Sequence, residues 1–584
     1  MNRMQLKRVV GMVGTPVAIV VALLLAPNAG GQSPIERALA SVPDSAAGVV
    51  VVPSLKRLND DLQQCLERMN RPGTAVIGRP IDQIKARLGI AVAVASRGPL
   101  VAWWPPSDGP ASPVRLIVPT DDSAAFLAGN FEPRPDDGED AHVGPDGRVW
   151  FARSLDGGIL LSTDAAAVRA YAATGEFGTT LFATLPDRWR TRLLDADVVA
   201  WGGPRAIADL ARQGRNEMPP EVANAPGFDA EAAERWREAF ETSLEAGIVA
   251  IDVDPLGVAV RTFAKLKSDS PLGQMVANAR PGSATFDRLP GNAFYLAGSL
   301  DLESIGGATP LRTFAGLAGL PGGSWLEVAA NLQRAQLAVY PSRLGVAAGG
   351  FFNDAALAIE ATDAAALRRS IEQGVAAAEG DAAGLRWSGS FERDRSLRKG
   401  GEADAFEVGQ TAIPADEEGA AGVVDLAQRQ LAWQIAFGSR GLNGFFKTVG
   451  EGWSVLTFSQ RPDVLDRAIE AAGGGGRRLD ANGAIRAMRS WLPEGAQAVG
   501  FVGVGQFGRL LKQLARMVPG GAEAFLPEIA TNIEPIGFGL EIGPGTFESA
   551  LIVPSGVLGL GYDVILDSVL PGGASDASED GVER

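Results

Sequence analysis

The chain has 584 residues and a formal net charge of -16. This acidic balance excludes a protein that tracks the phosphate backbone of nucleic acids, which requires clustered Lys and Arg. Hydrophobic residues make up 46% of the sequence and charged residues 21%, which is the composition of a folded protein. The length exceeds what one hydrophobic core usually supports, so we expect two or more domains.

The N-terminal residues have the order of a secretory signal. Three basic residues lie within the first eight positions, an apolar run follows at 17–25, and small turn-forming residues occupy 26–31. The apolar run is shorter than the roughly 20 residues of a membrane-spanning helix, which favours cleavage over anchoring. We therefore predict a signal peptide at 1–31 and an exported protein of the periplasm or cell envelope, or a secreted one. Membrane contact is expected only if this segment is retained.

A short sequence phrase recurs along the chain and indicates a repeated structural unit. A leucine or valine, often followed by proline and by small or acidic residues, leads into an apolar strand-like run and then an amphipathic helix. Four copies begin at Val42, Leu194, Leu289 and Leu492. After the first copy, apolar residues at 55, 58, 62, 65, 66 and 69 fall on one helical face. The phrase predicts strand-turn-helix units that bury one helical stripe against a sheet.

Two further phrases each occur twice, in the same relative order. A strand followed by Thr-Asp and an alanine-rich helix begins at Val114 and again at Leu357. A strand that contains tryptophan begins at Val149 and again at Trp453. This order predicts two related halves that join near 281–289.

Alternating stretches at 247–262 and 535–553 predict β-hairpins. Hairpins combined with helical crossovers favour an α+β fold of mainly antiparallel sheets with helices packed on one face.

The predicted domains are a first α+β domain at 32–285 and a second at 286–570. A polar, acidic stretch at 571–584 is predicted to be a disordered tail. Segments at 133–145 and 400–418 are interpreted as linkers because they are rich in polar residues, glycine and proline.

One cysteine, Cys65, and one histidine, His142, limit the chemistry of any site. A single cysteine excludes an internal disulfide, and the pair cannot assemble a zinc, copper or iron site of thiolate and imidazole ligands. His142 stands in an acidic stretch that we interpret as a solvated hairpin loop, and that stretch lacks the spacing of a calcium-binding EF-hand loop. We expect no metal site.

The segment 500–508 contains Gly-x-Gly-x-x-Gly between a predicted strand and a predicted helix, the context of a dinucleotide-binding loop. The corresponding breaks in the other copies of the recurring phrase lack this pattern, and no alternation of parallel strands surrounds it. We interpret the segment as a structural turn and expect no cofactor.

Adjacent tryptophans, Trp103 and Trp104, precede two prolines. Neighbouring strand residues face opposite ways, so one of these rings is expected to be exposed. The pair is therefore a candidate ligand-stacking surface. The other tryptophans, which include Trp387 and Trp433, are interpreted mainly as core residues.

Three features carry a family resemblance: the N-terminal signal, the Leu-Pro-like phrase that opens each unit, and the strand followed by Thr-Asp and an alanine-rich helix. In these features the chain resembles uncharacterised exported bacterial proteins. The resemblance is to those of planctomycete-like bacteria in particular, and it covers most of the mature chain. It implies no catalytic residues, because these families carry no assigned activity.

The sequence favours a non-enzymatic exported protein that binds or assembles with an envelope component or another protein. The alternative is a hydrolase of envelope polymers that uses an acidic pair, because paired carboxylates need no signature motif. Two carboxylates that converge in a concave pocket, at least one of them desolvated, would favour the enzyme.

Overall fold

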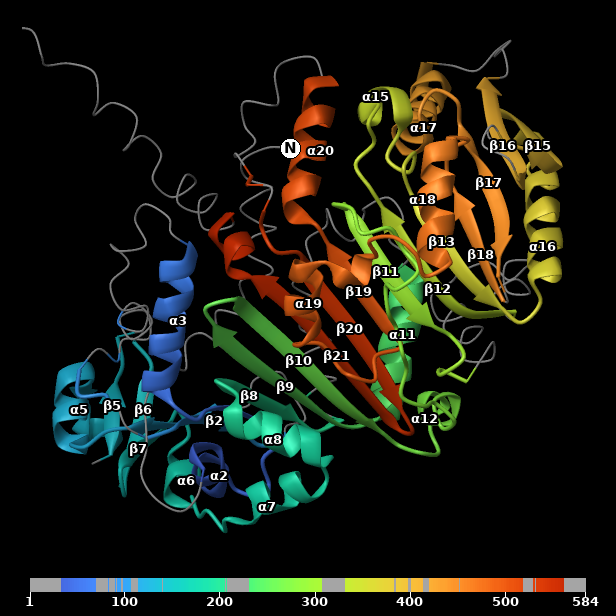
Figure 1. Ribbon diagram of the computed structural model, residues 1–584. Coiled ribbons are helices and arrows are strands. Elements are labelled where there is room, and N and C mark those ends of the chain that lie inside the picture. The colour runs from blue at the N-terminus through green and yellow to red at the C-terminus, as the bar shows by residue number, and fades with distance from the viewer. Residues whose placement is uncertain are drawn as a thin grey trace, which may run out of the picture. The chain divides into compact units, whose positions relative to one another are not determined.

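The computed structural model describes a defined part of the chain, shown in Figure 1. The described residues are 33–69, 82, 90, 92–95, 98–106, 114–138, 140–145, 147–204, 206, 230–306, 331–382, 385–397, 401–412, 420–450, 452–517, 529–530 and 532–560. The predicted signal peptide and acidic tail lie outside these residues. Within the described part, no helix is both long enough and apolar enough to span a membrane.

The chain forms two compact units. Unit 1 comprises residues 1–230, 237–266 and 554–584, and unit 2 comprises residues 231–236 and 267–553. Helices combine with antiparallel strands in both, so the predicted α+β class with a mainly antiparallel sheet is confirmed.

Unit 1 is built on ten strands whose neighbours all pair antiparallel. Their spatial order is β10-β9-β8-β1-β2-β3-β7-β6-β5-β4. The bounds are β1 (Gly48–Val52), β2 (Leu100–Trp104), β3 (Arg115–Pro119), β4 (Glu132–Pro133), β5 (Ala141–Val143), β6 (Val149–Leu155), β7 (Gly158–Ser162), β8 (Val198–Gly202), β9 (Leu244–Asp254) and β10 (Gly257–Leu266). The predicted hairpin at 247–262 is the β9–β10 pair.

Helices cover both faces of the unit 1 sheet. One face packs against α2 (Pro34–Ala40), α6 (Ala165–Arg169), α7 (Glu176–Ala183) and α8 (Asp187–Asp195). The other packs against α3 (Leu55–Met69) and α5 (Ser123–Asn130). The 3-10 turn η2 (Pro135–Asp137) follows β4, and α11 (Ala230–Ser243) precedes β9. The prediction that helices pack on one face only is therefore wrong for this unit.

The central strand β1 explains the two covered faces. Val49 and Val51 belong to the core under α2, α7 and α8, whereas Val50 and Val52 belong to the core under α3. Successive strand residues point to opposite faces, so an all-valine strand is apolar on both sides and needs cover on both. Leu58 of α3 packs with Val50 and Val52, where its cluster also includes the buried Cys65.

Unit 2 has eleven strands, again antiparallel throughout. Their order is β21-β20-β19-β11-β12-β13-β18-β17-β16-β15-β14. The bounds are β11 (Leu296–Asp301), β12 (Leu332–Val339), β13 (Ala356–Ala361), β14 (Gly380–Ala382), β15 (Leu385–Ser396), β16 (Glu402–Ala412), β17 (Leu442–Val449), β18 (Trp453–Thr457), β19 (Ala498–Val502), β20 (Ile536–Gly543) and β21 (Thr546–Pro554).

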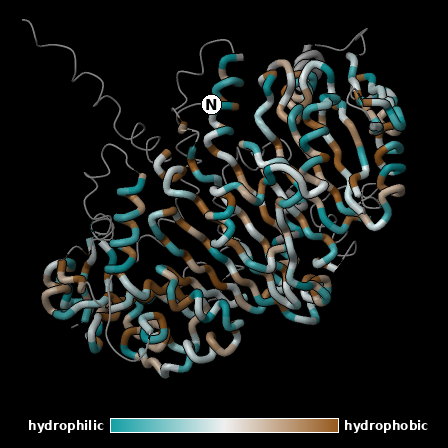
Figure 2. The backbone as a smooth tube through the Cα atoms, viewed as in Figure 1, coloured by the Kyte–Doolittle hydropathy of each residue, from teal (hydrophilic) through white to brown (hydrophobic). Residues whose placement is uncertain are grey.

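The helices of unit 2 connect these strands. They are α12 (Pro271–Met275), α15 (Gly345–Gly349), α16 (Ala364–Ala376), α17 (Ala420–Phe437), α18 (Pro462–Ala472), α19 (Gly483–Arg489) and α20 (Val504–Met517), with a 3-10 turn η3 (Leu479–Ala481). Figure 2 shows hydrophobic residues recurring along the strands and helices that carry both hydrophobic and hydrophilic residues. The helices are thus held by amphipathic packing on the sheet.

Two segments interpreted as linkers contain strands instead. Most of the segment 400–418 is β16, which pairs with β15 and β17. The segment 133–145 contains β5, in which His142 pairs with Trp150 of β6 and is half-buried rather than solvated. Polar composition misled the interpretation because edge and hairpin strands expose one face, where polar side chains are at no disadvantage.

We expect Val51→Thr and Val52→Thr each to lower the free energy of unfolding of unit 1 by about 1–3 kcal/mol, because each buries a hydroxyl group in one of the two cores. Chemical denaturation measures both. Val114→Thr is the control, since Val114 is 48% exposed and its replacement should stay within about 0.5 kcal/mol. Loss of stability in only one of the two strand variants would contradict burial on both faces.

Candidate functional site

A cavity of about 410 Å³ lies in unit 2 between α16, α17 and the strands β15 to β18. This volume is within the range of small-molecule sites. Every side chain that lines it is apolar: Ile371, Gly374, Val375, Ala378, Trp387, Phe406, Val408, Trp433, Leu442, Leu456 and Phe458.

Helix α16 forms one wall. Asp363 caps its N-terminus by accepting a hydrogen bond from the Ala366 amide at 2.8 Å. Arg368 ties the helix to the β15–β16 hairpin through ion pairs with Asp394 and Asp404. At Gly374 an added Cβ atom would meet no heavy atom within 4 Å, although the residue lines the cavity. Gly374 is exposed, so the cavity opens to the surface at this position.

Aromatic rings form the opposite wall. Trp387 of β15 and Trp433 of α17 meet edge to face, with ring centroids 5.0 Å apart. Trp433 also packs against Phe437 at 4.5 Å. The indole Nε1–H of Trp433 is buried without a hydrogen-bond partner in the described part of the chain. A buried donor left unpaired is costly, and because this atom is shut off from solvent the cost belongs to the fold itself.

The C-terminal end of α17 is fixed by backbone contacts. The amides of Phe351 and Phe352 donate to the carbonyls of Ile435 and Ala436 at 2.8 and 2.9 Å. Gly350 and Gly438 have positive φ angles, and a Cβ on Gly350 would lie 2.2 Å from the Gly438 nitrogen. Two glycines are therefore needed for this close approach, which holds Trp433 in place.

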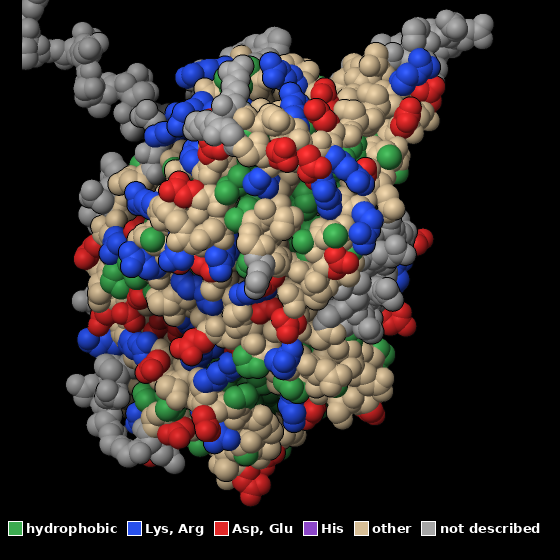
Figure 3. Space-filling model, turned by 45° about the vertical axis from the view of Figure 1, so that its right-hand side comes forward, with side chains coloured by type: hydrophobic (Ala, Val, Ile, Leu, Met, Phe, Trp, Pro, Cys, Tyr) green, Lys and Arg blue, Asp and Glu red, His purple; other side chains and the backbone are tan. Residues whose placement is uncertain are grey.

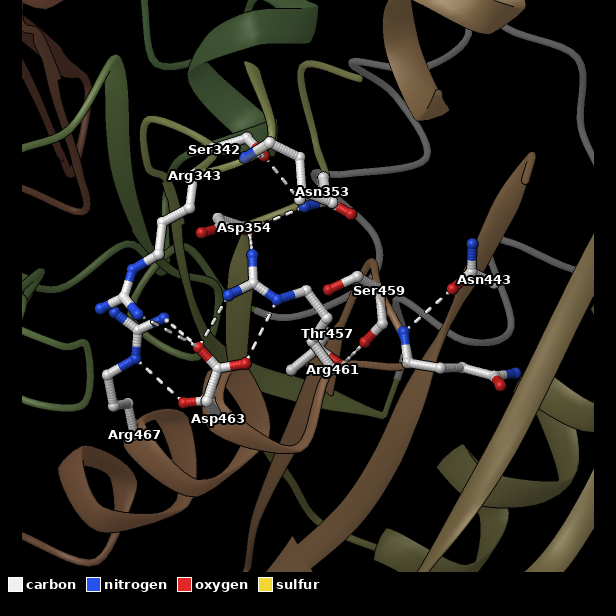
Figure 4. A network of polar contacts seen from close by, with 12 residues as sticks. Ser342, Arg343, Asn353, Asp354, Asn443, Thr457, Ser459, Arg461, Asp463 and Arg467 are labelled. Carbon is white, nitrogen blue, oxygen red and sulfur yellow. Dashed lines mark hydrogen bonds and ion pairs between the residues drawn. The ribbon is translucent and has the colours of Figure 1, made fainter. Parts of the chain in front are cut away.

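A polar cluster supports the end of β18 (Figure 4), and Phe458, the residue that follows this strand, lines the cavity. The Gln460 amide donates to Asn443 Oδ1 at 2.9 Å, and Gln460 Nε2 donates to the Phe406 carbonyl at 3.2 Å. The hydroxyl of Thr457 accepts from the Phe445 amide and donates to the Ser459 carbonyl, both at 3.1 Å. These bonds set the position of the strand end next to the cavity.

Arg461 joins two carboxylates in the same cluster (Figure 4). It lies 2.7 Å from Asp354, whose side chain is 4% exposed, and 2.8 Å from Asp463. Burial raises the pKa of Asp354, and the charge of Arg461 opposes that effect. Burial also acts to raise the pKa of Asp463, but the hydrogen bonds and positive charge of Arg461 outweigh burial, so that the pKa is lowered. The more exposed Arg343 and Arg467 approach Asp463 at 4.0 and 3.6 Å.

The lining of the cavity limits the chemistry that the cavity could support. No titratable or nucleophilic side chain occurs among the described residues that line it. General acid–base or covalent catalysis would need such a group within hydrogen-bond reach of the ligand.

The predicted stacking surface lies elsewhere, in unit 1. Trp103 is 1% exposed and packs in the core beside Tyr171, with ring centroids 5.7 Å apart. Trp104 is half-buried, and its indole covers Gly48, where an added Cβ would lie 2.2 Å from the ring. Trp103 therefore presents no ring to a ligand. The rings that line the cavity, Trp387 and Trp433, were interpreted as core residues.

The acidic pair sought for the alternative function also has a counterpart in unit 1. Asp61 and Asp197 both lie close to Arg57 Nε, at 3.4 and 3.2 Å. The side chain of Asp197 is 0% exposed, so it cannot touch a polymeric substrate. Among the described residues, no group of three or more His, Cys, Asp or Glu side chains could hold a metal ion. Burial lowers the pKa of His142, which favours its neutral form.

Charged side chains of both signs are interspersed on the face shown in Figure 3, with no separation by sign. A basic stripe of the kind that binds a phosphate backbone is absent from the described side chains on that face.

No family model and no curated protein sequence matches the chain. Two solved structures titled as crystal forms I and III of TP0453 are weakly similar. The first is 10% identical over 42% of this chain and 88% of the other, with a TM-score of 0.21. The second is 11% identical over 44% and 91%, with a TM-score of 0.19. Such scores carry no inference, and the resemblance to exported bacterial proteins stays a prediction.

We expect Arg461→Ala to destabilise unit 2 by about 3 kcal/mol at neutral pH, because it leaves the buried Asp354 without its cation. The loss should be smaller at pH 5. Without Arg461 the pKa of folded Asp354 rises further above its unfolded value. At low pH Asp354 is protonated and its burial costs little, whereas at higher pH it must ionise in the folded protein and stability is lost.

Denaturation at both pH values measures this effect. Arg343→Ala is the matched control, because Arg343 is 71% exposed and its removal should cost about 0.5 kcal/mol or less. Equal losses for the two arginines would contradict the assigned role of Arg461.

Proposed function

We propose that this protein is an exported, non-enzymatic binding protein whose unit 2 holds a small apolar molecule in the cavity between α16 and α17. The observation that carries the proposal is a cavity of about 410 Å³ with a wholly apolar lining, open to the surface beside the exposed Gly374. Ligand pockets are concave and lined predominantly by hydrophobic and aromatic side chains, as this one is.

The lining defines the chemistry of the ligand. A charged group in the cavity would find no counter-ion among the lining side chains and would carry its full desolvation penalty. The ligand is therefore neutral where it is enclosed, with an aliphatic or aromatic body that packs against Trp387 and Trp433.

We also propose that the two units descend from a duplication. In each, the first strand lies between the second strand and the first of the last three strands, and the intervening strands return as hairpins. Both units open with a serine-capped helix that has proline in its first turn, capped by Ser33 in α2 and by Ser270 in α12. The second copy then starts near Ser270, ahead of the join expected from sequence.

The cavity belongs to the elements in which the units differ. Strands β5 and β6 are joined by a turn closed by a bond from the Gly144 amide to the Arg148 carbonyl. The corresponding strands β16 and β17 are separated by a segment that contains α17. Strands β15 and β16 are also much longer than β4 and β5. These additions supply four of the eleven lining residues, Trp387, Phe406, Val408 and Trp433, which supports a binding role specific to unit 2.

Export is proposed from the N-terminal sequence. Intact-mass measurement of protein from its native host should show loss of roughly 29 to 33 residues, as the position of the small-residue zone implies. A cytoplasmic species that retains Met1 would contradict export without affecting the proposed ligand site.

Gly374→Leu should abolish binding while preserving the fold, because the side chain enters open space and a glycine is removed from a helix interior. The neutral probe N-phenyl-1-naphthylamine should bind the wild-type protein saturably, and the variant at least roughly tenfold more weakly. Gln373→Leu is the matched control, since it adds the same side chain at an exposed position of α16. Undiminished binding by Gly374→Leu would exclude this cavity as the site.

A bromine-labelled fatty alcohol should quench tryptophan fluorescence, because the bromine would lie in the cavity against Trp387 and Trp433. Replacing both by phenylalanine should remove most of the quenching, although nine of the eleven tryptophans remain. Trp104→Phe should leave it unchanged. The opposite pattern would transfer the ligand to the surface predicted from sequence.

A further inference from the structure

A second site lies in unit 1, where Asp197 stands just before β8. Its amide donates to the Ile251 carbonyl at 3.0 Å, and its Oδ2 accepts from the Val253 amide at 2.8 Å. Both bonds fasten β8 to β9. The side chain is fully buried, so its second oxygen, Oδ1, faces the protein interior rather than water.

Helix α3 brings two charged side chains to that oxygen. Arg57 Nε lies 3.2 Å from Asp197 Oδ1 and 3.4 Å from Asp61 Oδ2. Arg57 also donates to the Asp195 carbonyl. Asp61 and Asp197 thus share one guanidinium. Two ionised carboxylates against a single arginine leave one negative charge unbalanced, and a proton on either carboxylate removes it.

Unit 2 shows that the bond to the neighbouring strand does not need a charge. Gln497 stands just before β19, and its amide donates to the Leu540 carbonyl at 2.9 Å. Its side-chain oxygen accepts from the Ile542 amide at 2.6 Å, as Asp197 does from Val253. A neutral side chain therefore performs the same structural task. The carboxyl group of Asp197 has a further role, which its contacts place at α3.

We propose that Asp61 and Asp197 form a proton-binding pair that fastens α3 to the unit 1 sheet when it holds one proton and loosens it when both groups are ionised. With the proton, the pair carries one negative charge, which Arg57 balances. Without it, two carboxylates adjoin in a site where one is sealed from water, and repulsion adds to the desolvation of Asp197.

The surroundings fix the direction of the pH effect. Burial raises the pKa of Asp197 from 3.8 to about 6, and the Val253 amide and Arg57 oppose this while Asp61 adds to it. Burial likewise raises the pKa of Asp61, against the pull of Arg57 and with a smaller push from Asp60. Asp254 at the end of β9 and Arg68 of α3 complete the charges around the pair. Folded-state pKa values above the unfolded ones mean that stability is present at low pH and lost between about pH 4 and 6.

Hydrogen exchange of the α3 amides, corrected for intrinsic rates, tests the proposal in the intact mature protein. In the wild type, the equilibrium constant for local opening of α3 should rise roughly 20-fold between about pH 4.5 and pH 6.5. Asp197→Asn keeps an acceptor for Val253 and offers Asp61 a permanent donor, so most of this rise should disappear. Asp60→Asn, an exposed neighbour on the same helix, should keep it.

Asp61→Asn covers the case in which Asp197→Asn does not fold. The new amide donates to ionised Asp197, so the midpoint of the rise should move to lower pH. A rise that persists in Asp197→Asn, a midpoint unchanged in Asp61→Asn, or a flat wild-type profile would each overturn the proposal. These outcomes are independent of ligand binding in unit 2.

Discussion

A strand buried on both faces can hold no uncompensated charge, and this constraint orders both units. In unit 1 the valines of β1 fill two cores, one on each side of the sheet. Several buried polar groups stand at the ends of strands. Asp197 and Gln497 stand immediately before β8 and β19, and the Arg461 cluster follows β18. Asp197, Gln497 and Asp354 are buried, and each is tied to a backbone amide or to an opposite charge, as burial of polar groups requires.

The two units share one strand order but differ in the elements added to it. Unit 1 is packed on both faces of its sheet and buries Asp197 beside Arg57 and Asp61. Unit 2 lengthens a hairpin, adds α17 and leaves an apolar space beside Gly374. The space persists because its walls are fixed from outside: Arg368 holds α16 to the hairpin, and the approach of Gly350 to Gly438 holds α17. A cavity bounded by such restraints cannot collapse to recover its lost packing.

The sequence predicts the general class of this fold better than its sites. Hairpins and the amphipathic stripe of α3 follow from periodicity, which is a local property. The sequence did not reveal that both faces of the unit 1 sheet are covered, because a strand of consecutive valines shows no alternation of apolar and polar residues. The role of Trp433 as a cavity-lining residue was not predicted for a different reason. It depends on contact with Trp387, which is 46 positions away in sequence although the two ring centroids are 5.0 Å apart. Asp61 and Asp197 are likewise ordinary residues until α3 lies across the end of β8. Only tertiary structure reveals the apolar space at Gly374, because a missing side chain leaves no pattern.

The burial of Cys65 affects which redox conditions the protein can tolerate. Its thiol lies in the core beneath α3, and burial raises its pKa to about 11. Near neutral pH only about one thiol in ten thousand would then be the reactive thiolate, and the packed helix shields even that fraction from oxidants. An unpaired cysteine on the surface would cross-link copies of the protein wherever oxidants prevail. This one is inert, so the protein can pass through an oxidising compartment without a partner for its sulfur.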